Sequence, residues 1–333
     1  MQTSAVYIQN LCVPCASHCR YCLLSWDDHL RGIDYDRSAA YARKFYAWLQ
    51  AHRPDLDFQF YFGYSMDHPR LAEAIELLQS MGCVGGRFLQ FDGMQFRSDQ
   101  EIRQLLTMLL DHGIQLIDLT FYGTREYHDR FAGRIGDYDF MMRILTIANQ
   151  VGLPVEIGIP LTHENAGQIH TLLAEFSTYS LQRIFCFIPH SEGRGHTLDP
   201  IRFTRRDYEH LSTQVKALLN HNKFKTESEW VAQAPFPDHQ KRVLALSLTP
   251  DNIAHLEAME PADTIALLEQ LDDDYHCAIP SLNELIQHYG DPLGQAFYSQ
   301  RDLYLTYQRQ YIRDNHLDLY DINDERQCFS RRV

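Results

Sequence analysis

The sequence has little of what marks a secreted, membrane-bound or nucleic-acid-binding protein. Its 333 residues contain only eight cysteines, too few for a disulfide scaffold. No apolar run is long enough to span a membrane, and residues 1–8 lack the basic start and apolar core of a signal peptide. Acidic residues outnumber basic ones by 44 to 30, which disfavours a long nucleic-acid partner because phosphate binding relies on Lys and Arg. We therefore expect a soluble cytoplasmic protein with no membrane partner and, at 45% hydrophobic residues, a large core.

Short apolar runs alternate with amphipathic segments over the first 200 residues. This alternation is typical of βα units, which form parallel sheets and place the chain in the α/β class. The predicted strands are 5–8, 58–62, 88–91, 116–121, 155–159 and 184–188, and helical stripes lie at 71–78, 102–109, 141–148 and 169–176. Gly82, Gly113 and Gly152 follow the first three stripes, at positions where a left-handed glycine commonly ends a helix.

The periodicity becomes mainly helical from about residue 201 onward. Helices are predicted around 208–218, 265–271, 282–289 and 303–312. We therefore expect a core over residues 1–200 and a mainly helical C-terminal region over residues 201–333 that covers the opening of the core. The run Asp272-Asp273-Asp274 is interpreted as a solvated turn.

The most informative motif is a group of three cysteines directly after the first predicted strand. Cys15, Cys19 and Cys22 form a C-x-x-x-C-x-x-C frame. Three thiolates on one short loop can bind three irons of a cubane 4Fe-4S cluster and leave the fourth iron open to a ligand that is not protein. Cys12 and Cys15, like Cys19 and Cys22, also form C-x-x-C pairs, so a zinc site or a redox dithiol is the alternative interpretation.

The frame resembles the signature of the radical SAM superfamily, C-x-x-x-C-x-aromatic-C, with Tyr21 at the aromatic position. The resemblance implies a partial (β/α)6 barrel of parallel strands, with a 4Fe-4S cluster and S-adenosyl-L-methionine as cofactors. It also implies reductive cleavage of S-adenosylmethionine to a 5'-deoxyadenosyl radical, which abstracts hydrogen from a substrate. An electron donor such as flavodoxin or ferredoxin would then be a partner. In such barrels the chemistry takes place at the C-terminal ends of the strands.

The stretch after the second predicted strand departs from the family's pattern. Radical SAM enzymes usually carry Gly-Gly-Glu here, and this motif contacts the amino group of S-adenosylmethionine. The equivalent residues are Gly63, Tyr64 and Ser65, so one glycine is kept and the acid is absent. Ser65, or the nearby Asp67, is the candidate replacement for that acid.

The end of the fourth strand resembles the peptide-modifying radical SAM maturases that often carry a SPASM extension. Thr120 takes the place of a serine that contacts the ribose or the carboxylate, and Tyr122 follows in the same run. Ala132 stands where these maturases commonly keep a carboxylate-binding arginine, so Arg130 or Arg134 would have to substitute for it.

Other polar residues follow the fourth, fifth and sixth strands. His128 and Asp129 are interpreted as a helix-capping pair rather than as a general acid and base. Asn165 is a candidate contact to the ribose, with helix capping as its alternative role. Pro189 and Arg194 belong to a Pro...Gly-Arg-Gly turn whose backbone touches adenine in several radical SAM enzymes, and Arg194 would meet an anionic ligand.

The remaining cysteines bear on the reaction and on the number of clusters. Cys186 and Cys328 are candidate donors of a hydrogen atom to a substrate radical. A SPASM domain needs several more cysteines than Cys277 and Cys328, so we expect one cluster. The fourth-strand resemblance favours a peptide or protein substrate, with a small metabolite or nucleoside as the alternative. A non-catalytic iron-sulfur protein that binds or senses is the third hypothesis, because a fold does not guarantee a function.

Overall fold

The computed structural model describes residues 2–11, 15–22, 32–63, 65–191, 193–237 and 241–319. The strands are β1 (Gln2–Asn10), β2 (Asp57–Phe62), β3 (Phe88–Gln90), β4 (Leu116–Thr120), β5 (Val155–Pro160), β6 (Arg183–Phe187), β7 (Phe224–Thr226), β8 (Lys241–Leu248) and β9 (Phe297–Ser299). The helices are α1 (Tyr35–His52), α2 (Leu71–Ser80), α3 (Asp99–Asp111), α4 (Arg125–Ala132), α5 (Asp137–Val151), α6 (Ile169–Phe176), α7 (Arg205–His210), α8 (Thr213–Lys216), α9 (Glu227–Gln233), α10 (Ile253–Ala258), α11 (Pro261–Ala278), α12 (Leu282–Tyr289) and α13 (Gln300–Asp314). Short 3-10 turns are η1 (Ser65–Asp67), η2 (Val84–Gly86), η3 (Ala166–Gln168) and η4 (Gly193–Ile201).

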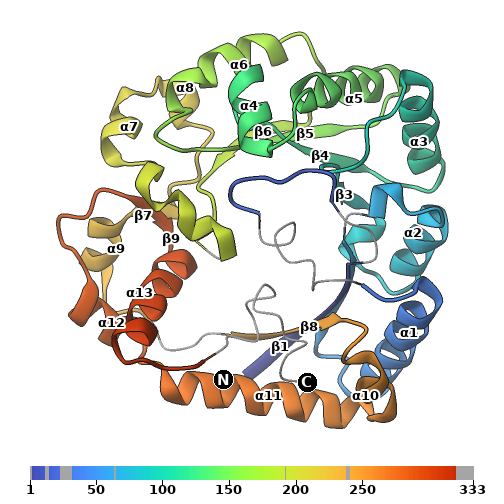
Figure 1. Ribbon diagram of the computed structural model, residues 1–333, viewed down its shortest axis with the longest axis vertical. Helices are drawn as coiled ribbons and strands as arrows, with labels where there is room; N and C mark the ends of the chain where they lie inside the picture. The colour runs from blue at the N-terminus through green and yellow to red at the C-terminus, as the bar shows by residue number, and fades with distance from the viewer. Residues whose placement is uncertain are drawn as a thin grey trace.

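Parallel strands form the inside of the molecule. One sheet has the order β3-β4-β5-β6, and another has the order β2-β1-β8. Each of β1 to β5 is followed by at least one helix, which returns the chain to the start of the next strand and so keeps neighbours parallel. Figure 1 shows the helices as an outer ring with the strands inside it. The predicted α/β class, the six predicted strands and the barrel-like arrangement of βα units are therefore confirmed.

The C-terminal region contributes a strand that the sequence analysis did not predict. The region is mainly helical, as expected, but β8 pairs in parallel with β1 from Gln2↔Lys241 to Asn10↔Leu248. β7 and β9 form a separate antiparallel pair, which lies next to α9 and α13 in Figure 1. A strand from the C-terminal region thus joins the sheet that contains the N-terminal strand β1. The expected division of the chain near residue 200 stays a prediction.

The acidic run in the C-terminal region was interpreted wrongly. Residues 272–274 lie inside α11 rather than in a turn, and Asp272 is fully buried. Its Oδ2 binds Nε of Arg242, a buried residue of β8, at 2.5 Å. Removing one partner of a buried ion pair leaves an uncompensated charge, so this contact fixes α11 to β8. The partner is distant in the sequence, and a local charge pattern cannot reveal it.

Two apolar layers between helices and strands form the core. One packs β3–β6 against α3, α5 and α6 and contains the fully buried Phe121 and Phe176. The other packs β1, β2 and β8 against α1, α2, α10 and α11 and contains Phe45 and Phe60. The predicted glycine helix ends are confirmed by positive φ angles at Gly82 (70°), Gly113 (78°) and Gly152 (80°). Within the described ranges, no helix combines the length and the apolar character that crossing a membrane requires.

Candidate functional site

A cavity of about 420 Å³ lies at the carboxyl ends of β3, β4 and β6. It is lined by Cys15, Ser17, Cys19, Tyr21 and Cys22, by Gln90, Asp92, Gly93, Asp118, Thr120 and Tyr122, and by Phe185, Phe187, His190, Lys223 and Phe224. The first group belongs to residues 15–22, which we call the cysteine loop. Segments that are far apart in the sequence thus meet at the end of the parallel strands where the sequence predicted the chemistry.

The cysteine loop is bound to the end of helix α4. The N–H groups of His18 and Arg20 donate to the carbonyls of Ala132 and Phe131, at 2.7 and 2.9 Å. The last four carbonyls of a helix have no partner within the helix, so the loop satisfies two groups that would otherwise need water. These two hydrogen bonds hold the cysteine loop against α4.

Two glycines let the backbone of neighbouring segments approach the loop. Gly133 ends α4 with φ of 64°, and a Cβ at this position would lie 2.9 Å from the carbonyl oxygen of His18. Gly93 follows β3 with φ of 73°, and its carbonyl accepts a hydrogen bond from the N–H of Ala16 at 2.7 Å. Both positions need the left-handed backbone that glycine adopts without strain.

The three cysteine thiols of the loop face one cavity. The Sγ of Cys19 lies 3.1 Å from the hydroxyl oxygen of Tyr122. Burial raises the pKa of Cys15 to about 12 and raises the pKa of Cys19 well above its usual value, and repulsion from the neighbouring cysteines adds to both shifts. Thiolates are the form that binds metal, so a positively charged metal centre would offset the burial and the repulsion.

Cysteine thiolates are the usual ligands of iron-sulfur clusters. In the part of the chain that the structure describes, no three His, Cys, Asp or Glu side chains lie close enough to share one metal ion. This spacing is compatible with a cubane, because its three thiolates bind three different irons rather than one. Cys12, which the zinc alternative uses, falls outside the described residues.

Three of the predicted cofactor-binding residues line this cavity. They are Tyr21, Thr120 and Tyr122. The two tyrosine rings meet edge to face, with centroids 5.9 Å apart. Thr120 donates its N–H and its hydroxyl to the two carboxylate oxygens of Asp92, at 3.0 and 2.8 Å. The predicted threonine therefore holds an acidic residue in the wall of the cavity.

Asn165 and Gly63 lie outside the lining of the cavity and have packing roles in the structure. The amide nitrogen of Asn165 donates to the carbonyls of Tyr122 and Pro160, at 2.7 and 2.6 Å, so the buried side chain ties the end of β4 to β5. Gly63 follows β2, where a Cβ would lie 2.4 Å from the side chain of Leu11. Contacts of these two residues with a cofactor stay predictions.

The charged candidates for binding the carboxylate and amino groups of the cofactor also have other partners. Arg134 donates to the carbonyl of Met94 at 2.7 Å and does not line the cavity. Arg130, the other candidate arginine, is exposed on α4. Asp67 is paired with Arg97 at 2.9 Å. The structure therefore brings none of these three charges into the cavity wall.

The remaining predicted cofactor-binding residues lie in the turn after β6 and in the segment after β2. The carbonyl of Pro189 accepts a hydrogen bond from Nη1 of Arg202 at 3.4 Å. Arg194 lies in η4, outside the lining of the cavity. Tyr64 and the side chain of Ser65 fall outside the described residues, so their predicted contacts stay predictions.

His128 and Asp129 have structural roles in the described chain. His128 is fully buried, and its Nδ1 accepts a hydrogen bond from the N–H of Tyr122 at 3.2 Å. Its Nε2 must then carry the proton and donate to Asp137 at 3.1 Å. Asp129 accepts from the N–H of Tyr138, at 2.8 Å, at the start of α5. His128 therefore joins the loop after β4 to the first turn of α5, and only Asp129, which accepts from the N–H groups at the start of α5, has the predicted capping role.

One of the two candidate hydrogen-atom donors, Cys186, does not line the cavity. Cys186 lies on β6 between Phe185 and Phe187, which both line the cavity. Because successive side chains of a strand point to opposite faces, the thiol of Cys186 faces the core, where it is buried. Burial raises its pKa to about 12. Cys328 falls outside the described residues.

Two carboxylates of the cavity were missed in the sequence. Burial raises the pKa of Asp92 to about 6. Burial, with repulsion from Asp92 and Glu156, raises the pKa of Asp118 to about 7. The Oδ1 of Asp118 is buried and has no hydrogen-bond partner among the described residues. For Asp118, the signal available in the sequence was an acid between the apolar residues Ile117 and Leu119 of a predicted strand.

No protein family model matches the sequence, and no curated protein does. Similar solved structures include SuiB from Streptococcus suis bound to the precursor peptide SuiA, with a TM-score of 0.48 and 10% identity over 87% of this chain and 56% of that one. Native anSMEcpe with bound AdoMet has a TM-score of 0.43 and 16% identity over 64% of this chain and 60% of that one. Coproporphyrinogen III oxidase (HemN) from Escherichia coli, described as a radical SAM enzyme, has a TM-score of 0.41 and 11% identity over 93% of this chain and 91% of that one. The chain thus spans about half the length of the first of these structures. All three TM-scores are below 0.5, so none of these similarities assigns a function to this chain.

Proposed function

We propose that this protein is a radical SAM enzyme with a single 4Fe-4S cluster. The observation that carries the proposal is that Cys15, Cys19 and Cys22, from one loop, line one cavity at the carboxyl ends of parallel strands. Their thiolates would hold the cluster. When bound, the cluster and S-adenosylmethionine supply the electron and the 5'-deoxyadenosyl radical that abstracts hydrogen from a substrate.

The residues of the cavity have distinct tasks in this proposal. The hydroxyl of Tyr122 donates to the thiolate of Cys19, 3.1 Å away, and so stabilises its negative charge. The buried rings of Tyr122 and Phe131 stack with centroids 4.7 Å apart and exclude water beside the cysteine loop. Asp92, held by Thr120, supplies a carboxylate for the ammonium group of S-adenosylmethionine. It takes over the task of the acid that is missing after β2.

We propose a peptide or protein as the substrate. The support is the sequence resemblance at the end of β4, where Thr120 and Tyr122 do line the cavity. A small metabolite or nucleoside is the second candidate, because a cavity of about 420 Å³ is within the range of small-molecule sites. A flavodoxin or ferredoxin would deliver the electron.

The proposal is tested by reconstituting the protein without oxygen and measuring iron, sulfide and 5'-deoxyadenosine with S-adenosylmethionine and dithionite. The test variant carries Cys15→Ala, Cys19→Ala and Cys22→Ala. The control is Cys277→Ala, which removes an exposed thiol from α11. Product that depends on the three loop cysteines supports the enzyme. A loaded cluster without product supports the binding or sensing alternative, and a protein that loads no cluster contradicts the proposal.

A further inference from the structure

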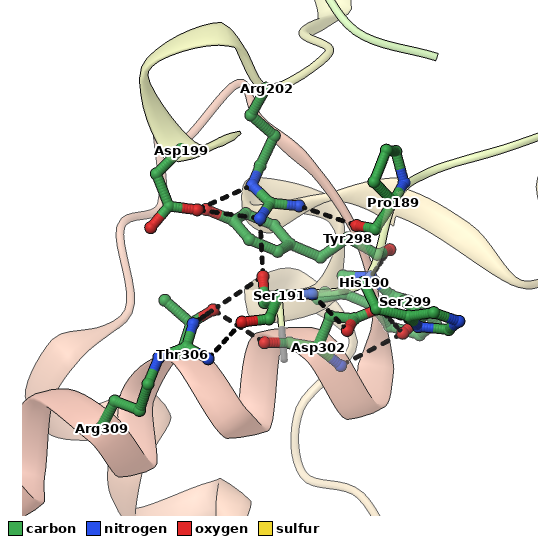
Figure 2. Close-up of polar contacts among 11 residues, drawn as sticks. Pro189, His190, Ser191, Asp199, Arg202, Tyr298, Ser299, Asp302, Thr306 and Arg309 are labelled. Atoms are coloured by element: carbon green, nitrogen blue, oxygen red, sulfur yellow. Dashed lines mark hydrogen bonds and ion pairs between the residues drawn. The ribbon is translucent and has the colours of Figure 1, made fainter. Parts of the chain in front are cut away.

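The loop after β6 is joined to helix α13 by a buried polar network (Figure 2). Asp302 lies in the first turn of α13 and is fully buried. It accepts hydrogen bonds from the N–H of Ser191, at 2.8 Å, and from the hydroxyl of Ser299. Its Oδ2 also lies 3.5 Å from Nδ1 of His190. Burial would raise the pKa of Asp302, but the contacts with His190, Ser299 and Ser191 lower it below its usual value, so the carboxylate is ionised.

The backbone on both sides of His190 is also fixed. Arg202, which is buried, donates to the hydroxyl of Ser191 at 2.6 Å and to the carbonyl of Pro189 at 3.4 Å. A Cβ at Gly195 would lie 1.9 Å from the carbonyl oxygen of His190, so the chain folds back here more tightly than any other residue permits. The position of His190 is therefore fixed by the hydrogen bonds of its neighbours Pro189 and Ser191 and by the contact of its side chain with Asp302.

The side chain of His190 lines the cavity and is 48% exposed. With Nδ1 turned toward Asp302, the Nε2 edge of the ring is the one that can meet a ligand. Lys223 lines the same cavity just before β7, and Phe185 and Phe187 line it from β6. The carboxylates of the cavity are Asp92, just after β3, and Asp118 on β4, and β5 separates these two strands from β6. The cavity thus has an acidic wall and a basic wall.

We propose that His190 and Lys223 bind a carboxylate group of the ligand and that Asp302 positions His190 for this contact. The ligand is then a carboxylate with an apolar or aromatic portion that packs on Phe185 and Phe187, because those rings line the same cavity. S-adenosylmethionine has a carboxylate, and a peptide substrate can supply one. The inference rests on the proposed function only in taking this cavity as the reaction site.

The test measures binding rather than turnover. The probes are N-acetyl-L-phenylalaninate and its neutral amide, titrated into cluster-loaded protein without oxygen and followed by NMR of the probe. We expect the carboxylate to bind about tenfold more tightly than the amide, the difference that one charge-assisted hydrogen bond gives. His190→Asn keeps a donor near Asp302 but removes the Nε2 edge, so it should reduce this preference to the part that Lys223 supplies, with no change in thermal stability. Equal binding of the two probes to the unmodified protein would overturn the proposal.

The positioning role of Asp302 has its own matched control. Asp302→Asn should weaken binding of the carboxylate probe several-fold, because it loses the charge that holds Nδ1 of His190. Ser299→Ala removes a bond to the same carboxylate but leaves the contact between Asp302 and His190. If both variants weaken binding of the carboxylate probe equally, the network has only a structural role and the positioning role of Asp302 is refuted.

Competition identifies the source of the carboxylate. S-adenosylmethionine and decarboxylated S-adenosylmethionine are added to the bound probe. Displacement by the first alone assigns the basic wall to the cofactor, and displacement by neither assigns it to the substrate. Displacement by both shows that the nucleoside occupies this wall, which would overturn the proposal. None of these readouts needs 5'-deoxyadenosine, so failure here is distinct from failure of the proposed enzyme activity.

Discussion

Replacing Gly133 with alanine should loosen the cysteine loop while the barrel stays folded. The φ of 64° at this position costs alanine about 1 kcal/mol more than glycine. The new Cβ would also lie 2.9 Å from the carbonyl oxygen and 3.0 Å from the Cβ of His18. The loop can relieve this contact only by moving away from α4, which weakens the hydrogen bond from His18 to Ala132, worth about 1 kcal/mol. We therefore expect a loss of about 2–3 kcal/mol in the free energy of unfolding.

Gly152→Ala is the matched control for this prediction. Gly152 also ends a helix with positive φ, at 80°, but a Cβ there has no atom within 4 Å. This variant should lose only the backbone term of about 1 kcal/mol. Urea unfolding measures both losses, and iron and sulfide per chain after anaerobic reconstitution measure the state of the loop. We expect Gly133→Ala to load less cluster than Gly152→Ala. Equal loading and equal stability in the two variants would refute the role assigned to the contact between Gly133 and His18.

Two further substitutions test the electrostatics of the cavity. Tyr122→Phe should leave the fold intact and lower the reduction potential of the loaded cluster by roughly 40 mV. The reason is that the hydrogen bond from this hydroxyl to the thiolate of Cys19 contributes about 1 kcal/mol. An unchanged potential in an EPR-monitored redox titration would contradict this prediction. The pKa of Asp118 is raised to about 7 in the folded state, so the folded protein holds a proton that the unfolded chain has released, and stability falls as pH rises. Between pH 5.5 and pH 8 Asp118 should contribute about 2 kcal/mol to this fall, and Asp118→Asn should remove that contribution in urea unfolding and leave the smaller one from Asp92. The same fall in the variant would show that another group is responsible.

Local signals in the sequence were enough for much of the fold. Each of the six predicted strands is present, because apolar β-rich runs bounded by turn residues encode a strand without reference to its neighbours. The three glycine helix ends are present for a similar reason, since the left-handed backbone is a property of one residue. The spacing of Cys15, Cys19 and Cys22 likewise placed three thiols on one loop, and the structure turns them to one cavity.

Only the tertiary structure decided which partner each polar side chain has. The same sequence motifs that indicated Asn165 and Arg134 as cofactor contacts cannot show that Pro160 and Met94 take up their hydrogen bonds. The acidic wall of the cavity, the position of His190 above Asp302 and the parallel pairing of β8 with β1 all join residues that are distant in the chain. Backbone conformation is determined over a few residues and can be predicted from them. A hydrogen bond, an ion pair or a strand pairing depends on which distant segment the folded chain brings within about 3 Å. A local sequence pattern carries no information about which segment that is.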